Sequence, residues 1–245
     1  MTPLPRREHA EELLDAPRHD MAELDQSLGH VASVNRWLGG VSAITRYVKL
    51  LLRRDGTVRL LDVATGSADI PLRIAQWARH HGHKVQILAT DVHPQMLELA
   101  RRRCRDYPEI SVEHADALAL PYEADSFDAA MLSLALHHFE GDDQLRVLRE
   151  MARVSREWVL VNDLERTTLN YVGAKLLAAT YWRGNRLTRH DGPLSVLRSF
   201  TKSELQAIGR AAGVGERVER HFFQRIVLIG DARSANDAAA RTEFK

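Results

Sequence analysis

Leu60–Ile70 reads LLDVATGSADI and joins an apolar run to a turn of small residues and the start of a helix. The apolar run ends at Asp62, and helix-like apolar spacing begins after Asp69. A buried strand that passes through such a turn into a helix brings backbone N–H groups close to a ligand. The segment therefore predicts the first strand, turn and helix of an α/β ligand-binding domain.

The acids of this segment indicate the charge of the ligand. A dinucleotide site has glycines in G-x-G-x-x-G spacing, with the pyrophosphate on the helix N-terminus. The corresponding residues here are Ala64, Gly66 and Asp69, and a carboxylate at the third position would repel a pyrophosphate. We therefore expect a ligand with positive charge, such as S-adenosylmethionine, which carries an α-amino group and a sulfonium.

The composition is that of a globular protein without a dominant charge. The 245 residues suit one α/β domain with additions, and 44% of them are hydrophobic. The net charge of +1 argues against the basic field of a nucleic-acid binder. One cysteine, Cys104, excludes an internal disulfide and a cysteine-based metal cluster, and we expect no metal site.

The chain shows neither a leader nor a membrane span. Residues Met1–Ala16 are charged and lack the apolar stretch of a signal peptide. No apolar run approaches the roughly 18 residues that cross a bilayer. We therefore expect a cytoplasmic protein, and the sequence leaves its oligomeric state open.

Strand-like and helix-like segments alternate along the chain, which predicts parallel βαβ units. The expected fold is a doubly wound, Rossmann-like α/β sheet of seven mostly parallel strands, with helices on both faces. Two N-terminal helices, broken at Gly39-Gly40, and a helical cap insertion complete it. We divide the chain into an N-terminal helical extension or lid (1–52), a cofactor-binding domain (53–232, cap insertion 166–200) and a flexible tail (233–245). The predicted strands are 58–63, 85–90, 110–114, 127–133, 158–163, 218–223 and 225–229.

Polar side chains follow each of the first four predicted strands. In a doubly wound sheet, ligands bind outside the carboxyl ends of the strands. Each acid alone has another interpretation, as a helix cap or a turn residue, but their succession favours a ligand site. The residues are Asp62 and Asp69, then Asp91, then Asp116, and finally Ser133 with His137 and His138.

On these residues the chain resembles the class I S-adenosylmethionine-dependent methyltransferases, nearest the branch of the ubiquinone/menaquinone C-methyltransferases. The resemblance covers about 60–163 and continues more loosely to 229. LLDVATGSAD resembles the family's first motif, TDVHPQML the second, and HADALALPY with SFDAA the third. LALHHF and LREMARV resemble the segments that follow, so that several motifs occur in the family's order.

The resemblance implies a role for each motif in binding S-adenosylmethionine. Asp91 would accept both ribose hydroxyls through charge-assisted hydrogen bonds. Asp116 would face the adenine amino group, with the Ala117 N–H beside the ring and Val92 and Met96 on its faces. Met96 is equally compatible with core packing alone. The methionine part and the remaining contacts fall to Asp62, Ala64, Thr65, Gly66, Asp69 and Ser133. Alanine at 64 and 68, in place of the family's glycine, predicts a slightly different turn.

Methyl transfer to a phenol or an acidic carbon benefits from a general base. His137 and His138, just past the fourth strand, are the first candidates, and His190 beside Asp191 is the second. A loop histidine is also commonly structural. The aromatic residues Tyr171, Tyr181 and Trp182 of the insertion, with Trp37 and Tyr47, would form an apolar lid or only pack the extra helices.

The expected acceptor is a small hydroxylated aromatic or a quinone- or polyketide-like metabolite, methylated on oxygen or carbon. We expect neither a nucleic-acid partner nor a segment that spans a membrane. A nucleic-acid or protein methyltransferase remains an alternative, although LALHHF stands where the former usually has an NPPY-type segment. A cofactor-binding partner module without catalysis is a further alternative, whereas Asp69 opposes a dehydrogenase.

Overall fold

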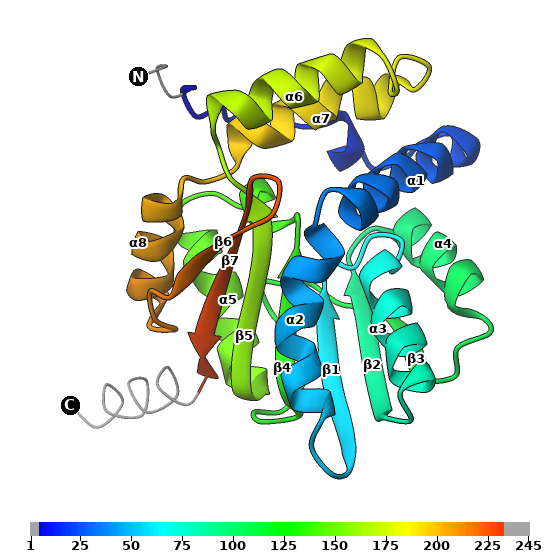
Figure 1. The fold of residues 1–245 in the computed structure, drawn as a ribbon, viewed down its shortest axis with the longest axis vertical. Coiled ribbons are helices and arrows are strands. Elements are labelled where there is room, and N and C mark those ends of the chain that lie inside the picture. Colours follow the sequence, from blue (N-terminus) through cyan, green and yellow to red (C-terminus); the bar gives the residue numbers. More distant parts are fainter. Residues whose placement is uncertain (1–4, 233–245) are drawn as a thin grey trace.

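A single seven-stranded sheet forms the centre of the computed structural model, which describes residues 5–232 (Figure 1). The strand order is β3-β2-β1-β4-β5-β7-β6, and β7 alone runs antiparallel to its neighbours. The chain reverses direction across the sheet between β1 and β4, which is the switch point of a doubly wound fold. The predicted fold class is thus confirmed. The strands are β1 (Thr57–Val63), β2 (Lys84–Asp91), β3 (Ile110–His114), β4 (Phe127–Ser133), β5 (Ser155–Leu164), β6 (Val218–His221) and β7 (Arg225–Asp231).

The observed strands agree with the predicted ones to within three residues. The largest difference is at the start of β5, which begins at Ser155 rather than at 158. No loop separates β5 from the preceding helix, because the Ser155 hydroxyl donates to the Met151 carbonyl while its backbone already enters the strand. The first residues of β5 are polar or charged and show no strand pattern, so the prediction began three residues too late.

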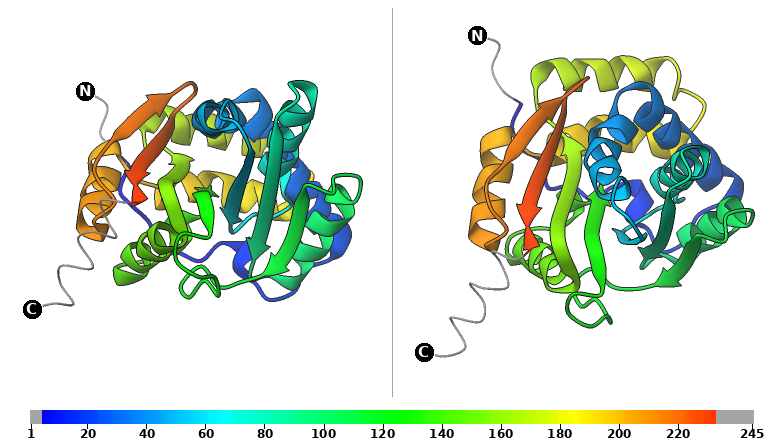
Figure 2. Two further views of the ribbon diagram at one scale, coloured as in Figure 1. Left: turned by 90° about the horizontal axis from the view of Figure 1, so that it is seen from below. Right: turned by 60° about the horizontal axis from the view of Figure 1, so that its bottom comes forward.

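Helices cover both faces of the sheet, as two views show (Figure 2). One face carries α2, α3 and α4, whose apolar residues pack with Leu60 and Ile87 of the strands. The other carries α5 and α8, which pack with Leu61 and Val161. Alternating strand residues therefore point into two separate cores, as parallel sheets require. These helices are α2 (Gly40–Leu52), α3 (Asp69–His80), α4 (Pro94–Cys104), α5 (Asp142–Val154) and α8 (Lys202–Ala212).

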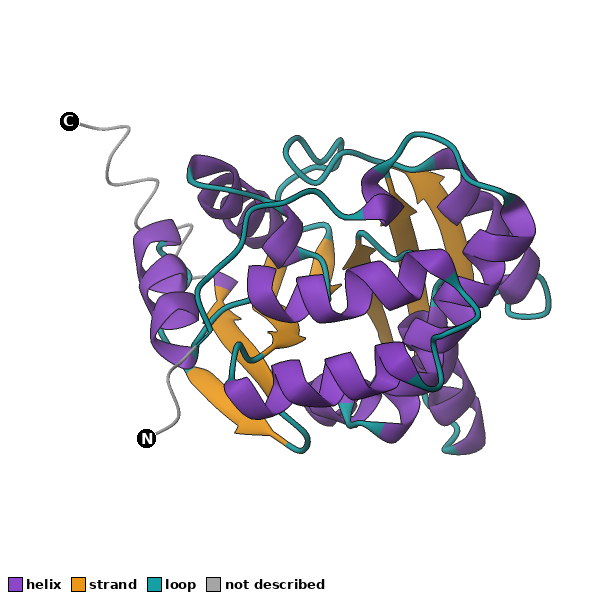
Figure 3. Cartoon of the chain, turned by 90° about the horizontal axis from the view of Figure 1, so that it is seen from above, coloured by secondary structure: helices purple, strands orange, loops and turns teal. Residues whose placement is uncertain are grey.

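The remaining helices lie across the carboxyl ends of the parallel strands (Figure 3). The α6 and α7 helices pack on each other through Ala174, Ala178 and Val196, with Trp182 in the turn between them. We call these two helices and their turn, residues 168–198, the cap. Beside the cap, Leu24 and Leu28 of α1 pack on α4 and α7. The helices are η1 (Leu13–Asp15), α1 (Met21–Trp37), η2 (Leu136–His138), α6 (Thr168–Ala179) and α7 (Arg186–Arg198).

The expected N-terminal extension of residues 1–52 is divided between two places. Helix α1 lies beside the cap, whereas α2 belongs to the core of the sheet through Ile44, Val48 and Leu51. The expected tail, 233–245, lies outside the described residues. Among residues 5–232, no helix has the length and apolarity to cross a membrane.

We expect Gly192→Ala to loosen the cap. A Cβ at residue 192 would lie 2.4 Å from Trp182 Cζ3, and Trp182 is a buried ring that cannot move without leaving its cluster. Overpacking of this kind costs about 1–3 kcal/mol of unfolding free energy. The measurement is urea unfolding followed by tryptophan fluorescence. Gly184→Ala is the control, since a Cβ there meets no atom within 4 Å. Equal stability of the two variants would contradict this packing.

Candidate functional site

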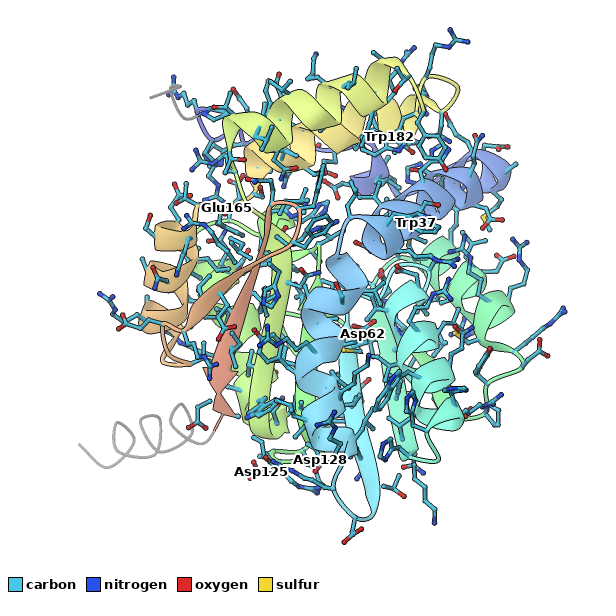
Figure 4. All side chains as sticks on the ribbon, in the orientation of Figure 1. Trp37, Asp62, Asp125, Asp128, Glu165 and Trp182 are labelled. Carbon is cyan, nitrogen blue, oxygen red and sulfur yellow. The ribbon has the colours of Figure 1, made fainter. Side chains whose placement is uncertain are left out.

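A cavity of about 590 Å³ opens at the carboxyl ends of β1, β2 and β4, beneath α1 and the cap. Figure 4 shows Trp182 in the cap above and Asp62 of β1 below it, and both line the cavity. The fold brings most of the predicted site residues together here. The predicted residues that line the cavity are Asp62, Ala64, Thr65, Gly66, Asp69, Asp91, Val92, Met96, Ser133, His137 and His138.

The turn after β1 keeps the backbone of a glycine turn despite its alanines. Ala64 and Ala68 have φ values of 53° and 58°, in the left-handed region, and Gly66 has 57°. Such a backbone costs an L-residue about 1–2 kcal/mol. Thr65 N donates to Thr90 O of β2 at 2.8 Å, and Ala68 N donates to Thr65 O at 3.0 Å. The expected difference in the turn is therefore wrong, because these bonds hold both alanines in the strained conformation.

Three carboxylates meet at the floor of the cavity. Burial raises the pKa of Asp62 to about 8, against the lowering effect of Thr65, and the nearby Asp69 and Asp91 raise it further. Thr65 Oγ1 donates to Asp62 Oδ2 at 2.5 Å. Burial also raises the pKa values of Asp69 and Asp91. Mutual repulsion between buried acids is relieved by a cation, so this floor favours a positively charged ligand.

Asp91 already caps the backbone of the two neighbouring turns. Its Oδ2 accepts from Gly66 N, and its Oδ1 accepts from His93 N, both at 2.9 Å. These bonds fix the carboxylate at the end of β2. A carboxylate oxygen accepts more than one hydrogen bond, so capacity remains for a ligand hydroxyl.

Arg225 and Asn35 belong to the site but were missed in the sequence. Asn35 Nδ2 donates to Asp69 Oδ2 at 3.1 Å, and Arg225 Nη2 donates to Asn35 Oδ1 at 3.2 Å. Arg225 is buried, which lowers its pKa to about 10, and its Nε and Nη1 have no hydrogen-bond partner among residues 5–232. An arginine at the start of an otherwise apolar strand, RIVLIGD, was the available signal. Because β7 is antiparallel, that start lies beside the carboxyl ends of the parallel strands.

His137 lies between two carboxylates. Its Nδ1 is 2.8 Å from Asp163 Oδ1, and its Nε2 is 3.5 Å from Glu12 Oε1. Burial lowers the pKa of His137, but Asp163 and Glu12 outweigh burial and raise it to about 10. The two carboxylates therefore favour the protonated imidazole, and the role of His137 as a general base stays a prediction.

The other two candidate bases differ in their access to the cavity. His138 lines the cavity, with its Nδ1 2.9 Å from Asp15 Oδ1. His190 is half exposed on α7, outside the cavity lining, and its Nδ1 pairs with Asp191 Oδ1 at 2.8 Å. Asp191 itself lines the cavity and accepts from Leu13 N and Leu14 N, so it anchors the N-terminal segment. The structure thus does not bring His190 to the site.

Two of the four predicted adenine contacts, Asp116 and Ala117, lie outside the lining of the cavity. Asp116 is exposed, and its Oδ1 accepts from Leu118 N at 2.9 Å, whereas Ala117 is buried in the core. Asp116 and Ala117 therefore stay predictions. At the cavity, Val92 is exposed, and Met96 packs against the α1 cluster while it also lines the space.

The aromatic residues expected over the site fall into two groups. Trp182 lines the cavity together with the neighbouring Leu176 and Leu177. Trp37 is 70% exposed and lies outside the lining. Tyr47 packs in the core, where its hydroxyl donates to Glu219 Oε2 at 2.7 Å. Of the aromatic residues expected over the site, Trp182 alone lines the cavity.

Comparison with known proteins identifies the family. Residues 60–157 match the family model described as a methyltransferase domain. The chain is 33% identical over 142 residues to a ubiquinone/menaquinone biosynthesis C-methyltransferase of Geobacter sp. (strain M21), covering 57% of this chain and 54% of that protein. It is 29% identical over 125 residues to a demethylmenaquinone methyltransferase of Lysinibacillus sphaericus (strain C3-41), covering 51% of each.

Solved structures agree at the level of the fold. The crystal structure of an S-adenosylmethionine-dependent methyltransferase from Aquifex aeolicus has a TM-score of 0.61 at 16% identity, covering 88% of this chain and 100% of that one. Together these matches support a class I S-adenosylmethionine-dependent methyltransferase similar to the ubiquinone/menaquinone C-methyltransferases. It spans about half the length of the curated relatives it matches.

The family implies S-adenosylmethionine as the cofactor, and the residues present fit it. The three buried acids suit its cationic groups. Arg225, with two unpaired nitrogens, suits its carboxylate, and the Ser133 hydroxyl is a buried polar atom without a partner among residues 5–232. Buried polar atoms are rarely left unpaired, which points to a polar ligand at this site.

We expect Asp62→Asn to stabilise the unliganded protein while weakening cofactor binding. The folded state raises the pKa of Asp62 above the ordinary value for an aspartate. Folding therefore takes up a proton between that value and about 8, and the stability contributed by this group falls as pH rises through that window. At pH 8 the neutral amide should raise the unfolding free energy by at least about 1 kcal/mol, with a smaller gain at pH 5.

Thermal melting at both pH values, with and without S-adenosylhomocysteine, measures the two effects of Asp62→Asn. The exposed Asp55 provides the control variant, Asp55→Asn. If Asp62→Asn lowers the stability at pH 8, the raised pKa of Asp62 is contradicted. If it leaves the affinity for S-adenosylhomocysteine unaltered, the contact between Asp62 and the cofactor is contradicted.

Proposed function

We propose that the protein transfers the methyl group of S-adenosylmethionine to a small, hydroxylated aromatic or quinone- or polyketide-like acceptor, on oxygen or carbon. One observation supports this most strongly. A single cavity has three buried acids on its floor and an apolar cap over it. The floor suits the cationic cofactor, and the cap suits an apolar acceptor.

Each part of the cofactor has a group in this chain suited to bind it. Asp91, at the end of β2, would accept the ribose hydroxyls. Asp62 and Asp69 would face the positive end of the methionine part, and Arg225 its carboxylate. When bound, the cofactor supplies an electrophilic methyl group on a sulfonium with a neutral leaving group.

The protein contributes orientation and exclusion of water. Holding two reactants in line supplies on the order of 7–11 kcal/mol of the barrier. The side chains of Trp182, Leu177 and Val196 line the upper part of the cavity, so an acceptor there would be shielded from solvent. We propose that α1 and the cap, rather than the whole of residues 1–52, act as the lid.

The lining favours an acceptor with a flat apolar body and polar substituents. Apolar groups come from α1, the cap and the loop after β6, while Ser133 and His138 supply polar groups at the end of β4. The curated relatives carry quinone-pathway names, which agree with such a ring. The apolar lining residues of α1, the cap, the end of β5 and the loop after β6 include Val31, Val34, Leu38, Leu164, Ala174, Leu176, Leu177, Trp182, Val196 and Phe223.

Within this proposal the protein acts on a small molecule in the cytoplasm. A nucleic-acid or protein acceptor and a silent cofactor-binding module are the alternatives. We would measure methyl transfer from labelled S-adenosylmethionine to a panel of phenols, catechols and quinols, with tRNA and a mixed protein substrate beside them. Product on the small aromatics supports the proposal, whereas product only on tRNA or protein overturns it.

We expect Asp91→Ala to weaken binding of S-adenosylhomocysteine by about 10–100-fold or more. Hydrogen bonds to a charged group contribute about 1.5–3 kcal/mol each, and about 1.4 kcal/mol corresponds to a tenfold change in affinity. Isothermal titration calorimetry gives the affinity. Thermal melting confirms that the variant folds, since Asp91 also caps Gly66 and His93. Asp106→Ala, at an exposed acid after α4, is the control, and an affinity equal to it would refute the ribose contact.

A further inference from the structure

Two histidines and a glutamate converge at one wall of the cavity. His137 Nε2 lies 3.5 Å from Glu12 Oε1, and His138 Nε2 lies 3.8 Å from Glu12 Oε2. The ligating atoms of the three side chains all lie within 4.8 Å of one another. With metal–ligand bonds of about 2.0–2.2 Å and tetrahedral angles, ligand atoms stand about 3.4 Å apart. The cluster therefore has nearly the spacing of a coordination shell.

The orientation of both rings agrees with metal ligation. His137 Nδ1 donates to Asp163 Oδ1 at 2.8 Å, and His138 Nδ1 donates to Asp15 Oδ1 at 2.9 Å. Each Nδ1 is thus occupied by a carboxylate, and each Nε2 is turned toward Glu12. Metal-ligating histidines almost always bond their other ring nitrogen in this way, which fixes the tautomer and the ring.

The cluster also contains a buried polar atom that lacks a partner. His137 is 2% exposed, and its Nε2 makes no hydrogen bond within the described part of the chain. Glu12 is 5% exposed and is held in place by Ser195 Oγ, which donates to Oε1 at 2.9 Å. Arg198 is the nearest guanidinium, with its Nε 3.9 Å from Glu12 Oε1, and it leaves His137 Nε2 without a hydrogen bond. A buried polar atom without a partner is costly. A ligand that satisfies the Nε2 and Glu12 together removes that cost.

We propose that Glu12, His137 and His138 bind a divalent transition-metal ion through one carboxylate oxygen and two Nε2 atoms. Two histidines and one glutamate are the ligand set of several catalytic zinc sites, and two histidines and a carboxylate also bind iron(II). The neutral form of His137 is the ligand, so metal binding releases the Nε2 proton to solvent. Three protein ligands leave at least one coordination position open, and all three residues line the cavity.

The open position indicates what the metal would do, and this step rests on the proposed methyl transfer. A Lewis acid at the cavity wall would bind an oxygen of a hydroxylated acceptor, orient it and lower the pKa of its hydroxyl. It would thereby favour the ionised acceptor oxygen, as a general base would. This requirement narrows the range of proposed acceptors to those with an oxygen atom that can bind the metal. Catechols and hydroxyquinols are the chemical class that fits best.

The site was not expected from the sequence because its ligands lie far apart. Glu12 comes from the segment before α1, which Asp191 anchors to the cap, whereas the histidines follow β4. His81 and His83, which are close together in sequence, stack on Trp77 at the surface instead, and His80 meets the His81 ring edge-on.

The test is cobalt(II) binding by the metal-free, full-length protein. We expect one equivalent of Co²⁺ to produce visible d–d absorption that Zn²⁺ abolishes. Glu12→Gln and His138→Gln should each weaken Co²⁺ binding by more than the ~10–100-fold that an outer-shell partner contributes. His190→Gln is the matched control, because that ring also pairs with a carboxylate but lies outside the cluster. It should bind Co²⁺ as the unaltered protein does.

Absence of these bands, or bands unchanged in both Glu12→Gln and His138→Gln, would overturn the metal site. Thermal melting and S-adenosylhomocysteine titration of each variant establish that it is folded and binds cofactor. The two proposals fail separately. Methyl transfer that persists in chelator, with no Co²⁺ bound, refutes the metal but not the transferase. Stoichiometric Co²⁺ binding without transfer to any acceptor refutes the transferase but not the metal site.

Discussion

Mutual repulsion between Asp62, Asp69 and Asp91 is the constraint on which the site depends. The carboxyl ends of β1 and β2 bring these acids together, and no ion pair neutralises any of them among residues 5–232. Burial raises the pKa of each acid, and for Asp62 the nearby Asp69 and Asp91 raise it further. The protein tolerates this arrangement because strained alanines and backbone bonds hold the turn in place. A cation in the cavity converts the same feature into binding free energy.

The cap completes the site by a different kind of interaction. It contributes few polar groups of its own to the cavity and closes it with Trp182, Leu177 and Val196. The N-terminal segment is tied to the cap by backbone bonds to Asp191, and its Glu12 meets the histidines after β4. In the proposed arrangement, the cofactor on the floor and the acceptor at the wall would therefore be bound by separate elements, and Ser133 and His138 line the same cavity.

Much of the fold was predictable because it rests on local patterns. Apolar strands, turns of small residues and Gly39-Gly40 each act over a few residues, and the strand and helix bounds follow closely. The floor of the cavity was predictable for the same reason, since the parallel neighbours β1 and β2 end at the same edge of the sheet, where Asp62 and Asp91 lie. The left-handed backbone of Ala64 and Ala68 could not be predicted from the sequence. Hydrogen bonds to β2 and within the turn override the preference of alanine for negative φ.

The rest of the site depends on contacts between distant segments. Arg225 reaches Asn35, and Glu12 reaches His137, through packing of the cap and α1 that no short motif encodes. The role of His137 could not be predicted from its residue type and its place in the sequence alone. Its position after β4 suggested a base, but only the structure shows that Asp163 and Glu12 face its two ring nitrogens and raise its pKa. A histidine's role is set by what faces its two nitrogens.

The most direct test of the central account is a crystal structure of the full chain with S-adenosylhomocysteine. The account predicts the product in the cavity, with both ribose hydroxyls within hydrogen-bond distance of Asp91 and the amino group facing Asp62 and Asp69. A product bound away from this floor, or one whose carboxylate rather than its amino group faces the acids, would contradict it.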